Sequence, residues 1–265
     1  ASLGITTLDT TNLVNDYSSY SCGISTFQGL GPEAVLSVAV PGAQYLAAVH
    51  DNSYDGVIFG YDQCDPTIAA ACVGGQDSLG ELEGFTHQNT TVNSQTIYVF
   101  TDGWDSIDYG PVDVGLNVYD PAAGGDTCAT AIPINKTAAQ QVGGVSLTYS
   151  YQGFTADYDL PMTGCTMYTE PGLDVVFSIV LDTTDSLDVT LRPAGGNDTS
   201  VYLLVGNCTD PNAQCVAGAD VGFSGDPEYI TGYSPTANGT TVYIVVDGYL
   251  LSETDDAFLL NVTVQ

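Results

Sequence analysis

Basic residues are almost missing from this chain of 265 residues. Lys136 and Arg192 are the only two, against 32 acidic residues, so the formal net charge is −30. Nucleic acids and anionic membrane surfaces are bound through clustered lysine and arginine, so both are excluded as partners. A surface of this charge repels itself, and the protein is therefore expected to work where cations screen or bridge it.

Long hydrophobic runs and catalytic motifs are also scarce. No stretch approaches the roughly 18–20 apolar residues of a membrane span, so membrane insertion is not expected. His50 and His87 lie in unrelated settings, without a nucleophile elbow, a zinc-protease motif or a phosphate loop. The composition does not exclude a pair of catalytic carboxylates of the glycosidase type, because acidic residues are abundant. The acids are expected mostly in solvated turns, however, such as the Asp-Gly pairs at 102–103 and 247–248. The sequence favours a protein that is not an enzyme.

Cysteine spacing indicates the compartment in which the chain works. Cys64 and Cys72 enclose "DPTIAAA", and Cys208 and Cys215 enclose "TDPNAQ"; neither loop has the two-residue gap of a zinc or redox motif. We therefore predict the disulfides Cys64–Cys72 and Cys208–Cys215, which persist in oxidising compartments and indicate a secreted or cell-surface protein.

Six Asn-x-Ser/Thr sequences are candidate glycosylation sites if the host glycosylates: Asn89, Asn135, Asn197, Asn207, Asn238 and Asn261.

The chain repeats itself once. Cys22, Cys64 and Cys72 align with Cys165, Cys208 and Cys215 at offsets of 143 or 144 residues. "VFTDGW" likewise aligns with "IVVDGY", and "GLNVYD" with "LLNVTV". A period this long indicates domain duplication rather than a solenoid. With the boundary in the small-residue stretch "PAAGG", two domains are predicted, 1–121 and 125–265.

Both copies show the period of two that is typical of β-strands. In the second copy Val175, Phe177, Ile179 and Leu181 alternate with their neighbours, and similar runs follow between Gly, Pro, Asn and Asp clusters. Such runs predict an all-β chain of two tandem antiparallel jelly-roll-like β-sandwiches. No convincing amphipathic helix is present, and "PTIAAA" is expected to form one helical turn at most.

The order of several segments resembles a known family. "GDTCATAIPI", the acidic turn "DYDLPMTGC", "GLDVVFSIVL", "LDVTLRPAGGNDTSVYLL", a cysteine loop, "VYIVVDGY" and "FLLNVTV" together resemble bacterial pre-peptidase C-terminal (PPC) domains. The closest resemblance is to the tandem, cysteine-containing form in secreted deltaproteobacterial proteins, over residues 125–265 nearly end to end and 1–120 with gaps. It implies a secreted, non-catalytic β-sandwich that is appended to peptidases or repeated in surface proteins.

The resemblance also implies a cofactor, Ca²⁺. Some members of the family bind calcium where an acidic turn faces an acid at the head of a strand, and Ca²⁺ prefers several carboxylate and amide oxygens. The residues that match are Asp157, Asp159 and Asp174 in the second copy and Asn15, Asp16 and Glu33 in the first.

The first copy begins later in the pattern than the second. In the second copy Cys128 and a candidate strand in "TAIPINKT" precede Cys165, and we predict a Cys128–Cys165 disulfide. The first copy has only 21 residues before Cys22 and no cysteine among them. Either upstream residues are missing from this sequence, or another chain supplies the strand and bonds Cys22. Residues 1–12 are expected to run extended along the domain or across an interface.

These features predict an extracellular structural or adhesive protein, a subunit of a fibre or surface assembly that associates with itself head to tail. Seventeen tyrosines suit such contacts, because tyrosine supplies amphipathic surface at interfaces. The alternative is an accessory module of a secreted hydrolase that grips a polysaccharide or protein fibre. Exposed aromatic residues on one sheet, such as Trp104, Tyr233 or Tyr249, would favour the alternative.

Overall fold

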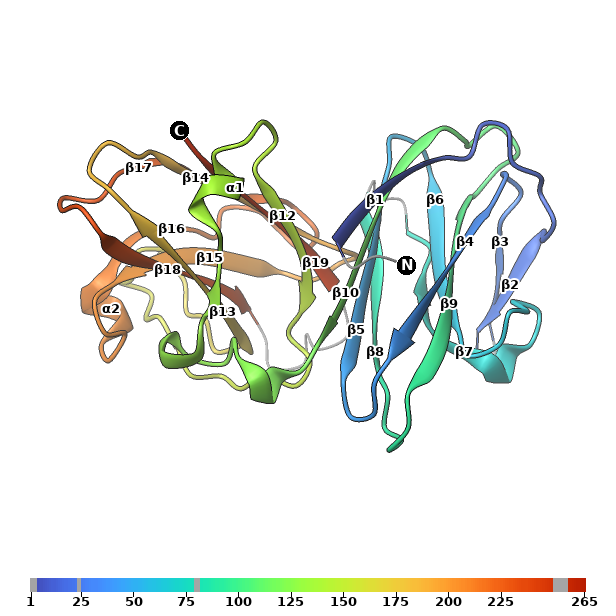
Figure 1. Cartoon of the computed structure of the whole chain (residues 1–265), viewed down its shortest axis with the longest axis horizontal. Helices are drawn as coiled ribbons and strands as arrows, with labels where there is room; N and C mark the ends of the chain where they lie inside the picture. Colours follow the sequence, from blue (N-terminus) through green and yellow to red (C-terminus); the bar gives the residue numbers. More distant parts are fainter. Residues whose placement is uncertain (1–3, 23–24, 79–81, 250–256) are drawn as a thin grey trace. The chain divides into compact units, whose positions relative to one another are not determined.

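The computed structural model describes residues 4–22, 25–78, 82–249 and 257–265. They form two compact units, whose main division falls between Asp120 and Pro121. Each unit is built from antiparallel β-sheets that pack as a sandwich (Figure 1), and the all-β prediction is confirmed.

The first unit consists of two four-stranded sheets and a hairpin. The sheets have the strand orders β1-β10-β5-β8 and β4-β9-β6-β7, and β2 pairs with β3. One turn of 3-10 helix, η1 (Ala69–Ala71), falls within "PTIAAA", which agrees with the prediction of one turn at most. The strands are β1 (Gly4–Asp9), β2 (Ser19–Cys22), β3 (Ser25–Gln28), β4 (Ala34–Val40), β5 (Tyr45–Asp51), β6 (Gly56–Tyr61), β7 (Cys72–Gln76), β8 (Leu82–Gln88), β9 (Gln95–Gly103) and β10 (Pro111–Tyr119).

The second unit repeats this arrangement with an added strand. Its sheets have the orders β12-β19-β14-β17 and β11-β13-β18-β15-β16. The strands are β11 (Ile132–Pro133), β12 (Val145–Ser150), β13 (Asp174–Leu181), β14 (Leu187–Pro193), β15 (Thr199–Val205), β16 (Cys215–Ala219), β17 (Glu228–Tyr233), β18 (Thr240–Gly248) and β19 (Ala257–Val264). Its helical turns are η2 (Pro121–Ala123), η3 (Cys128–Thr130), α1 (Lys136–Ala139) and α2 (Pro211–Gln214).

The two units share one topology. With β2, β3 and β11 left aside, the eight strands of each unit, counted along the chain, lie in the orders 1-8-3-6 and 2-7-4-5. This is the order of a jelly roll, in which strands that are distant in sequence pair across the sheet. It makes β1 the counterpart of β12 and β4 the counterpart of β13.

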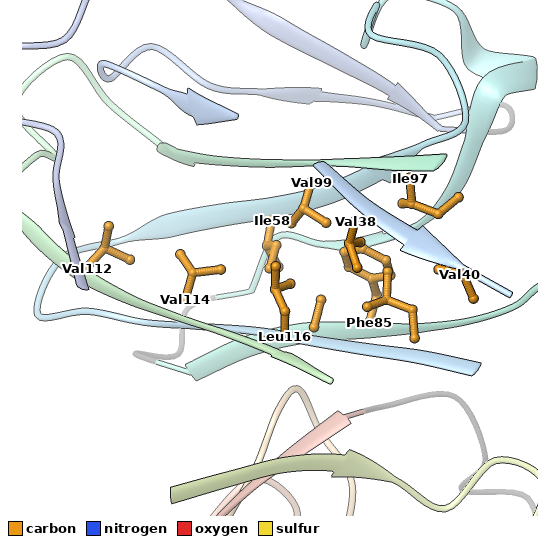
Figure 2. Packing of buried hydrophobic residues seen from close by; sticks show 11 residues of the cluster. Val38, Val40, Ile58, Phe85, Ile97, Val99, Val112, Val114 and Leu116 are labelled. Atoms are coloured by element: carbon orange, nitrogen blue, oxygen red, sulfur yellow. The ribbon is translucent and has the colours of Figure 1, made fainter. Parts of the chain in front are cut away.

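Alternating apolar side chains fill the space between the two sheets of the first unit. Figure 2 shows Val38, Ile58 and Val99 from one sheet near Phe85 and Val114 from the other. All five side chains are at most 4% exposed. Burial of an aliphatic or aromatic side chain of this size contributes about 1.5–3 kcal/mol, so this cluster is a main source of stability.

The β4-β9-β6-β7 sheet is also covered on its outer face. Between β1 and β4 the chain passes over this sheet and brings Tyr20 onto Phe59, with 5.3 Å between ring centroids, and Phe27 onto the same ring at 5.0 Å. Because both faces are covered, every residue of β6 is buried. Its sequence "GVIFGY" is accordingly a continuous apolar run and not an alternating one.

The two units differ at one edge of this covered sheet. In the second unit β11 pairs in parallel with β13, with Ile132 opposite Phe177. In the described part of the first unit, β4 is itself the edge strand. The strand expected in "TAIPINKT" is only two residues long, because α1 begins directly afterwards with Asn135 as its N-cap. The extended course predicted for the N-terminal residues is confirmed for residues 4–9, which pair with β10 as β1.

Candidate functional site

In both units the acidic turn lies against the head of a strand. The Asp16 amide donates to both carboxylate oxygens of Glu33, at 2.8 and 3.0 Å. In the second unit the amides of Asp157 and Tyr158 donate to Asp174 Oδ2, at 2.6 and 2.8 Å. The resemblance therefore brought the right segments together, but the contact seen is a carboxylate that accepts backbone N–H groups and fixes the turn.

The other residues expected to bind calcium are directed elsewhere. Asn15 Nδ2 donates to the Leu30 carbonyl at 2.5 Å, and Asp157 Oδ2 accepts from the Thr155 hydroxyl at 2.6 Å. Asp159 is exposed. Within the described ranges no group of three or more His, Cys, Asp or Glu side chains is arranged to hold a metal ion.

The fit to a cation differs between the two units. Both oxygens of Glu33 are engaged by an amide, which leaves the first unit poorly suited to calcium. In the second unit Asp174 Oδ1 is buried and has no hydrogen-bond partner. Calcium stays a prediction for the second unit, where the Asp157 and Asp159 carboxylates are exposed.

The two Asp-Gly pairs are not solvated turns, which corrects the sequence-based expectation. Asp102 and Asp247 are the penultimate residues of β9 and β18, and both are 0% exposed. The Tyr20 hydroxyl donates to Asp102 Oδ2 at 2.8 Å, and the Tyr202 hydroxyl donates to Asp247 Oδ2 at 3.0 Å. The covering segment over each sheet removes these strand ends from water, which the dipeptide alone does not reveal.

Burial makes these acids unusually reluctant to ionise. It raises the pKa of Asp102 to about 7 and that of Asp174 to about 7, and it raises the pKa of Asp247 well above its ordinary value. Asp174 and Asp247 are directly opposite each other in the β13–β18 ladder, and Oδ1 of each is buried without a donor. One proton held between the two carboxyl groups gives both oxygens a partner and removes one buried charge.

A second pair of acids lies in the same unit and has no counterpart in the sequence predictions. Burial raises the pKa of Glu170 to about 8 and that of Asp220 to about 6, and the two carboxyl groups interact directly. Both Glu170 oxygens are buried. Nothing in the local sequence distinguishes Glu170 or Asp220 from a loop acid, so sequence reasoning had no signal for them.

Two further buried acids hold loops and could have been found from the duplication. Glu83 accepts from the Ser78 amide at 2.6 Å, and Glu228 accepts from the amides of Val221 and Gly222 at 2.6–3.0 Å. The two glutamates are 145 residues apart, within the range of offsets that the repeat sets. Each glutamate, at the start of β8 or β17, accepts hydrogen bonds from backbone amides a few residues before its own strand.

Of the two histidines, His50 has the surroundings of a core residue. His50 is 0% exposed, and Nδ1 lies 2.6 Å from the Thr101 hydroxyl, while Asn52 contacts the other ring nitrogen. Burial lowers the pKa of His50 to about 4, so the ring is neutral at physiological pH. His87 Nε2 lies 3.3 Å from Gln95 Oε1.

The disulfide pairing differs from all three predicted bonds. The structure pairs Cys22 with Cys72, Cys165 with Cys215 and Cys128 with Cys208. Cys22 is therefore bonded within the chain, and Cys64 is free and exposed. Among the predicted bonds, Cys64–Cys72, Cys208–Cys215 and Cys128–Cys165 are each wrong.

The reason lies in the position of the cysteine loops between strands. Cys72 and Cys215 are the first residues of β7 and β16, and their side chains meet the segment that covers the sheet, which carries Cys22 or Cys165. Cys64 and Cys208 lie in the loops that follow the preceding strands, β6 and β15. The two cysteines that flank each short loop are therefore close in sequence but do not bond with each other.

The candidate glycosylation sites differ in exposure. Asn89 is 0% exposed, and its Nδ2 donates to the carbonyls of Val40 and Asn93, at 2.8 Å each. Asn261 Nδ2 donates to the Gly143 carbonyl. Asn197 is half-buried, and three acceptors are exposed: Asn135, Asn207 and Asn238.

No protein-family model matches the chain, and no curated protein is significantly similar to it.

Proposed function

We propose that this chain is a non-catalytic extracellular structural or adhesive subunit that associates head to tail into a fibre or surface assembly. The observation that carries the proposal is the difference between two copies of one jelly roll. The edge of β13 is covered by β11, whereas β4 is an edge strand in the described part of the first unit. The open edge of a sheet can pair with an added strand. Because one domain copy has such an edge and the other has it covered, the two ends of the chain differ, as head-to-tail association requires.

Three further observations are consistent with this function. The three disulfides suit an oxidising compartment outside the cytosol. Among the described residues, no helix has the length and apolar character needed to cross a membrane. The buried titratable groups, such as His50, Asp102 and Asp174, hold loops and strands, which is a structural use of side chains that enzymes often place in open clefts.

The test is the size of the particles in solution. Light scattering and negative-stain images across a concentration series, with and without divalent cations to screen the charge of −30, should show filaments or species that grow with concentration. A monodisperse monomer under all of these conditions would contradict the proposal.

One observation favours the alternative, an accessory module that grips a substrate polymer. In the second unit Val221 and Tyr229, which are 81% and 58% exposed, line a hollow together with Pro227, and Phe223, two residues after Val221, is 83% exposed. Exposed aromatic side chains suit stacking on sugar rings or contacts with a protein fibre. Co-sedimentation with insoluble polysaccharides and collagen fibres, with Phe223→Ser as the variant that should lose binding, tests this alternative.

A further inference from the structure

We propose that Asn238 modifies itself: the backbone amide of Gly239 attacks the Asn238 side chain, and the residue becomes aspartate or isoaspartate with release of ammonia. The site lies in the turn between β17 and β18. The groups that promote the reaction come from the turn between β13 and β14. This inference goes beyond the proposed function and does not depend on the formation of a fibre.

The two turns meet at the end of the β13–β18 ladder. Leu181 and Thr240 form the last pair of this ladder, so Asp182 and Gly239 are the next residues on the two strands. Asn238 and Gly239 are both exposed. Water therefore has access to the turn, and the second step of the reaction needs it.

The nucleophile is the backbone nitrogen of Gly239. When this nitrogen bonds to Cγ of the preceding asparagine, a five-membered ring closes within the chain, and such intramolecular attack is favoured by proximity. Gly239 has a φ of 70°, and a Cβ built on it would meet no described atom within 4 Å. The left-handed backbone suits glycine, and the absence of a side chain leaves the nitrogen unhindered.

Asp182 is placed to take the proton from this nitrogen. The Gly239 amide donates to Asp182 Oδ1 at 3.0 Å, which is within reach of a general base. Asp182 Oδ2 accepts from Lys136 Nζ at 2.9 Å, so the carboxylate is held with Oδ1 toward the amide. Hydrogen bonds from Lys136 and then from the Gly239 amide lower the pKa of Asp182, so the base is ionised at neutral and mildly acidic pH.

Thr183 polarises the group that is attacked. Its amide and its hydroxyl donate to Asn238 Oδ1, at 2.9 and 2.8 Å. Negative charge develops on this oxygen when the nitrogen adds to Cγ, and two donors directed at it stabilise that charge as an oxyanion hole does. A base, a nucleophile and a polarised carbonyl group are thus brought together at one turn.

The equivalent turn of the first unit lacks the base and the hydroxyl. The β4–β9 ladder ends with Val40 opposite Gln95, in the same way as the β13–β18 ladder ends in the second unit. The residues that follow Val40 are Pro41-Gly42, which carry neither a carboxylate nor a hydroxyl. The residues that precede Gln95 are Asn93-Ser94, an asparagine followed by serine and not by glycine. The first unit therefore serves as an internal control.

The reaction balances in two steps. Asp182 takes the amide proton while the Gly239 nitrogen bonds to Asn238 Cγ, and the bond from Cγ to Nδ2 breaks as that proton passes to the departing nitrogen, which leaves as ammonia. Water then adds to one of the two carbonyl carbons of the cyclic imide and breaks the bond from that carbon to nitrogen. Aspartate or isoaspartate results, depending on the carbon attacked. Water is the only co-reactant, and nothing is oxidised or reduced.

The modification changes the turn in two ways. It adds a carboxylate beside Asp182 in a chain whose formal net charge is already −30. It also removes the amide nitrogen to which a glycan on Asn238 would be attached. Glycosylation and self-modification of this residue therefore exclude each other.

The experiment compares the intact folded chain with a synthetic peptide of residues 234–243, SPTANGTTVY, in the same buffer. Peptide mapping by mass spectrometry measures the fraction of Asn238 converted to aspartate or isoaspartate over time. We expect the folded chain to react about tenfold faster than the peptide or more. From about pH 5 to about pH 7 its rate should stay level, because Asp182 remains ionised, whereas the peptide relies on hydroxide and should react faster as pH rises.

Three variants isolate the groups involved. Asp182→Asn removes the base, and Asn238 should then react at the rate of the peptide or below it, with the pH dependence of the peptide. Thr183→Val removes the hydroxyl but keeps the amide donor, and it should slow the reaction about tenfold. Ser94→Gly creates an Asn-Gly pair at Asn93 in the first unit. This matched control should react no faster than the peptide.

The proposal is overturned if the folded chain reacts more slowly than the peptide, because the hydrogen bonds would then protect the turn and not activate it. It is also overturned if Asp182→Asn keeps the rate and the level pH profile of the wild type, or if the Ser94→Gly chain converts Asn93 as fast as Asn238. The comparison of wild-type chain and peptide involves no substitution, so it decides the matter even where a variant fails to fold.

Discussion

The two units of this chain are one jelly roll in two states of completion. Both join the segment over the covered sheet to the next edge strand, through Cys22–Cys72 and Cys165–Cys215, each spanning 50 residues. Only the second adds Cys128–Cys208 and a strand beside β13. The comparison separates what the fold requires from what completes it. The sheets, the buried acids and one disulfide suffice for the fold, whereas the edge segment decides whether apolar surface is left exposed.

The largest expected difference between the units concerns the cysteines after β6 and β15. Replacing both Cys128 and Cys208 with serine opens a loop of 80 residues, and the chain-entropy estimate gives a loss of about 4.5 kcal/mol from the second unit. Cys64→Ser should leave the first unit unchanged, because that thiol has no bond to lose. Urea unfolding followed by circular dichroism measures both units, and the fluorescence of Trp104, the chain's single tryptophan, reports on the first alone. Equal losses in both variants would show that the units do not differ as described.

The next difference concerns β13, which is paired with β11, and β4, which is an edge strand in the described part of the first unit. Val176→Ala removes two methyl groups from a fully buried site and should cost the second unit about 2 kcal/mol. Val35→Ala acts on a side chain that is 42% exposed and should cost the first unit less than about 1 kcal/mol. Denaturation midpoints of the two variants, measured side by side, check the ratio. A cost for Val35→Ala as large as that for Val176→Ala would mean that the β4 edge is covered after all.

The sequence sufficed for the sandwich because alternation is a local property. Val175, Phe177 and Ile179 alternate with their neighbours whether or not the opposite sheet is known, so the strand pattern predicted two jelly rolls correctly. The cysteine pairing could not be obtained in this way. Pairing Cys64 with Cys72 respects the repeat, and pairing Cys22 with Cys72 respects it equally, so the duplication alone cannot choose between them. The choice is made by the segment that folds over the sheet, a long-range contact.

The buried acids were misread for a related reason. Asp102 and Asp247 lie in Asp-Gly pairs, which end strands in solvated hairpins as readily as in covered ones. Only the tyrosine that donates to each aspartate distinguishes the cases, and the two units take it from different places: Tyr20 belongs to the covering hairpin and Tyr202 to β15. A residue-by-residue alignment of the copies therefore misses the shared hydrogen bond to the aspartate.

A smaller difference concerns Glu83 and Glu228, the glutamates at the start of β8 and β17. Burial, with Asp77 and Asp55 nearby, raises the pKa of Glu83 to about 9, and one of its oxygens has no donor. The folded chain therefore keeps a proton that the unfolded chain loses above about pH 4.5, so Glu83 makes the first unit less stable as pH rises from about 4.5 to about 9. Glu83→Gln should abolish this slope and stabilise the first unit by about 2 kcal/mol at pH 8, with little change at pH 5.

The matched control for that prediction is Glu228→Gln. Glu228 accepts from the amides of Val221 and Gly222 with both oxygens, so the change should cost the second unit about 1 kcal/mol. Unfolding midpoints at pH 5 and pH 8, read from Trp104 for the first unit and from circular dichroism for both, provide the measurement. A stability of Glu83→Gln that still falls with pH as steeply as the wild type would assign the slope to other acids.

The smallest expected effect is that of calcium, and it too should differ between the units. In the second unit Asp157 and Asp159 are exposed and two backbone amides bind a single oxygen of Asp174, whereas both oxygens of Glu33 are taken by one amide. A site with the dissociation constant of about 1 mM that is common in extracellular modules would stabilise the second unit by about 1 kcal/mol in 5 mM calcium. The charge of −30 complicates the reading, because any divalent cation relieves the repulsion of both units together.

The measurement must therefore compare calcium with magnesium at equal ionic strength. Screening predicts equal upward shifts of both unfolding transitions with either ion, and a chelator reverses them. A site predicts an additional shift with calcium alone, confined to the transition that Trp104 fluorescence does not report. That additional shift should disappear in a variant carrying Asp157→Asn and Asp159→Asn and persist in Asn15→Ala. If calcium and magnesium act alike and elemental analysis finds no bound metal, the acidic turns of both units are held by their backbone hydrogen bonds alone.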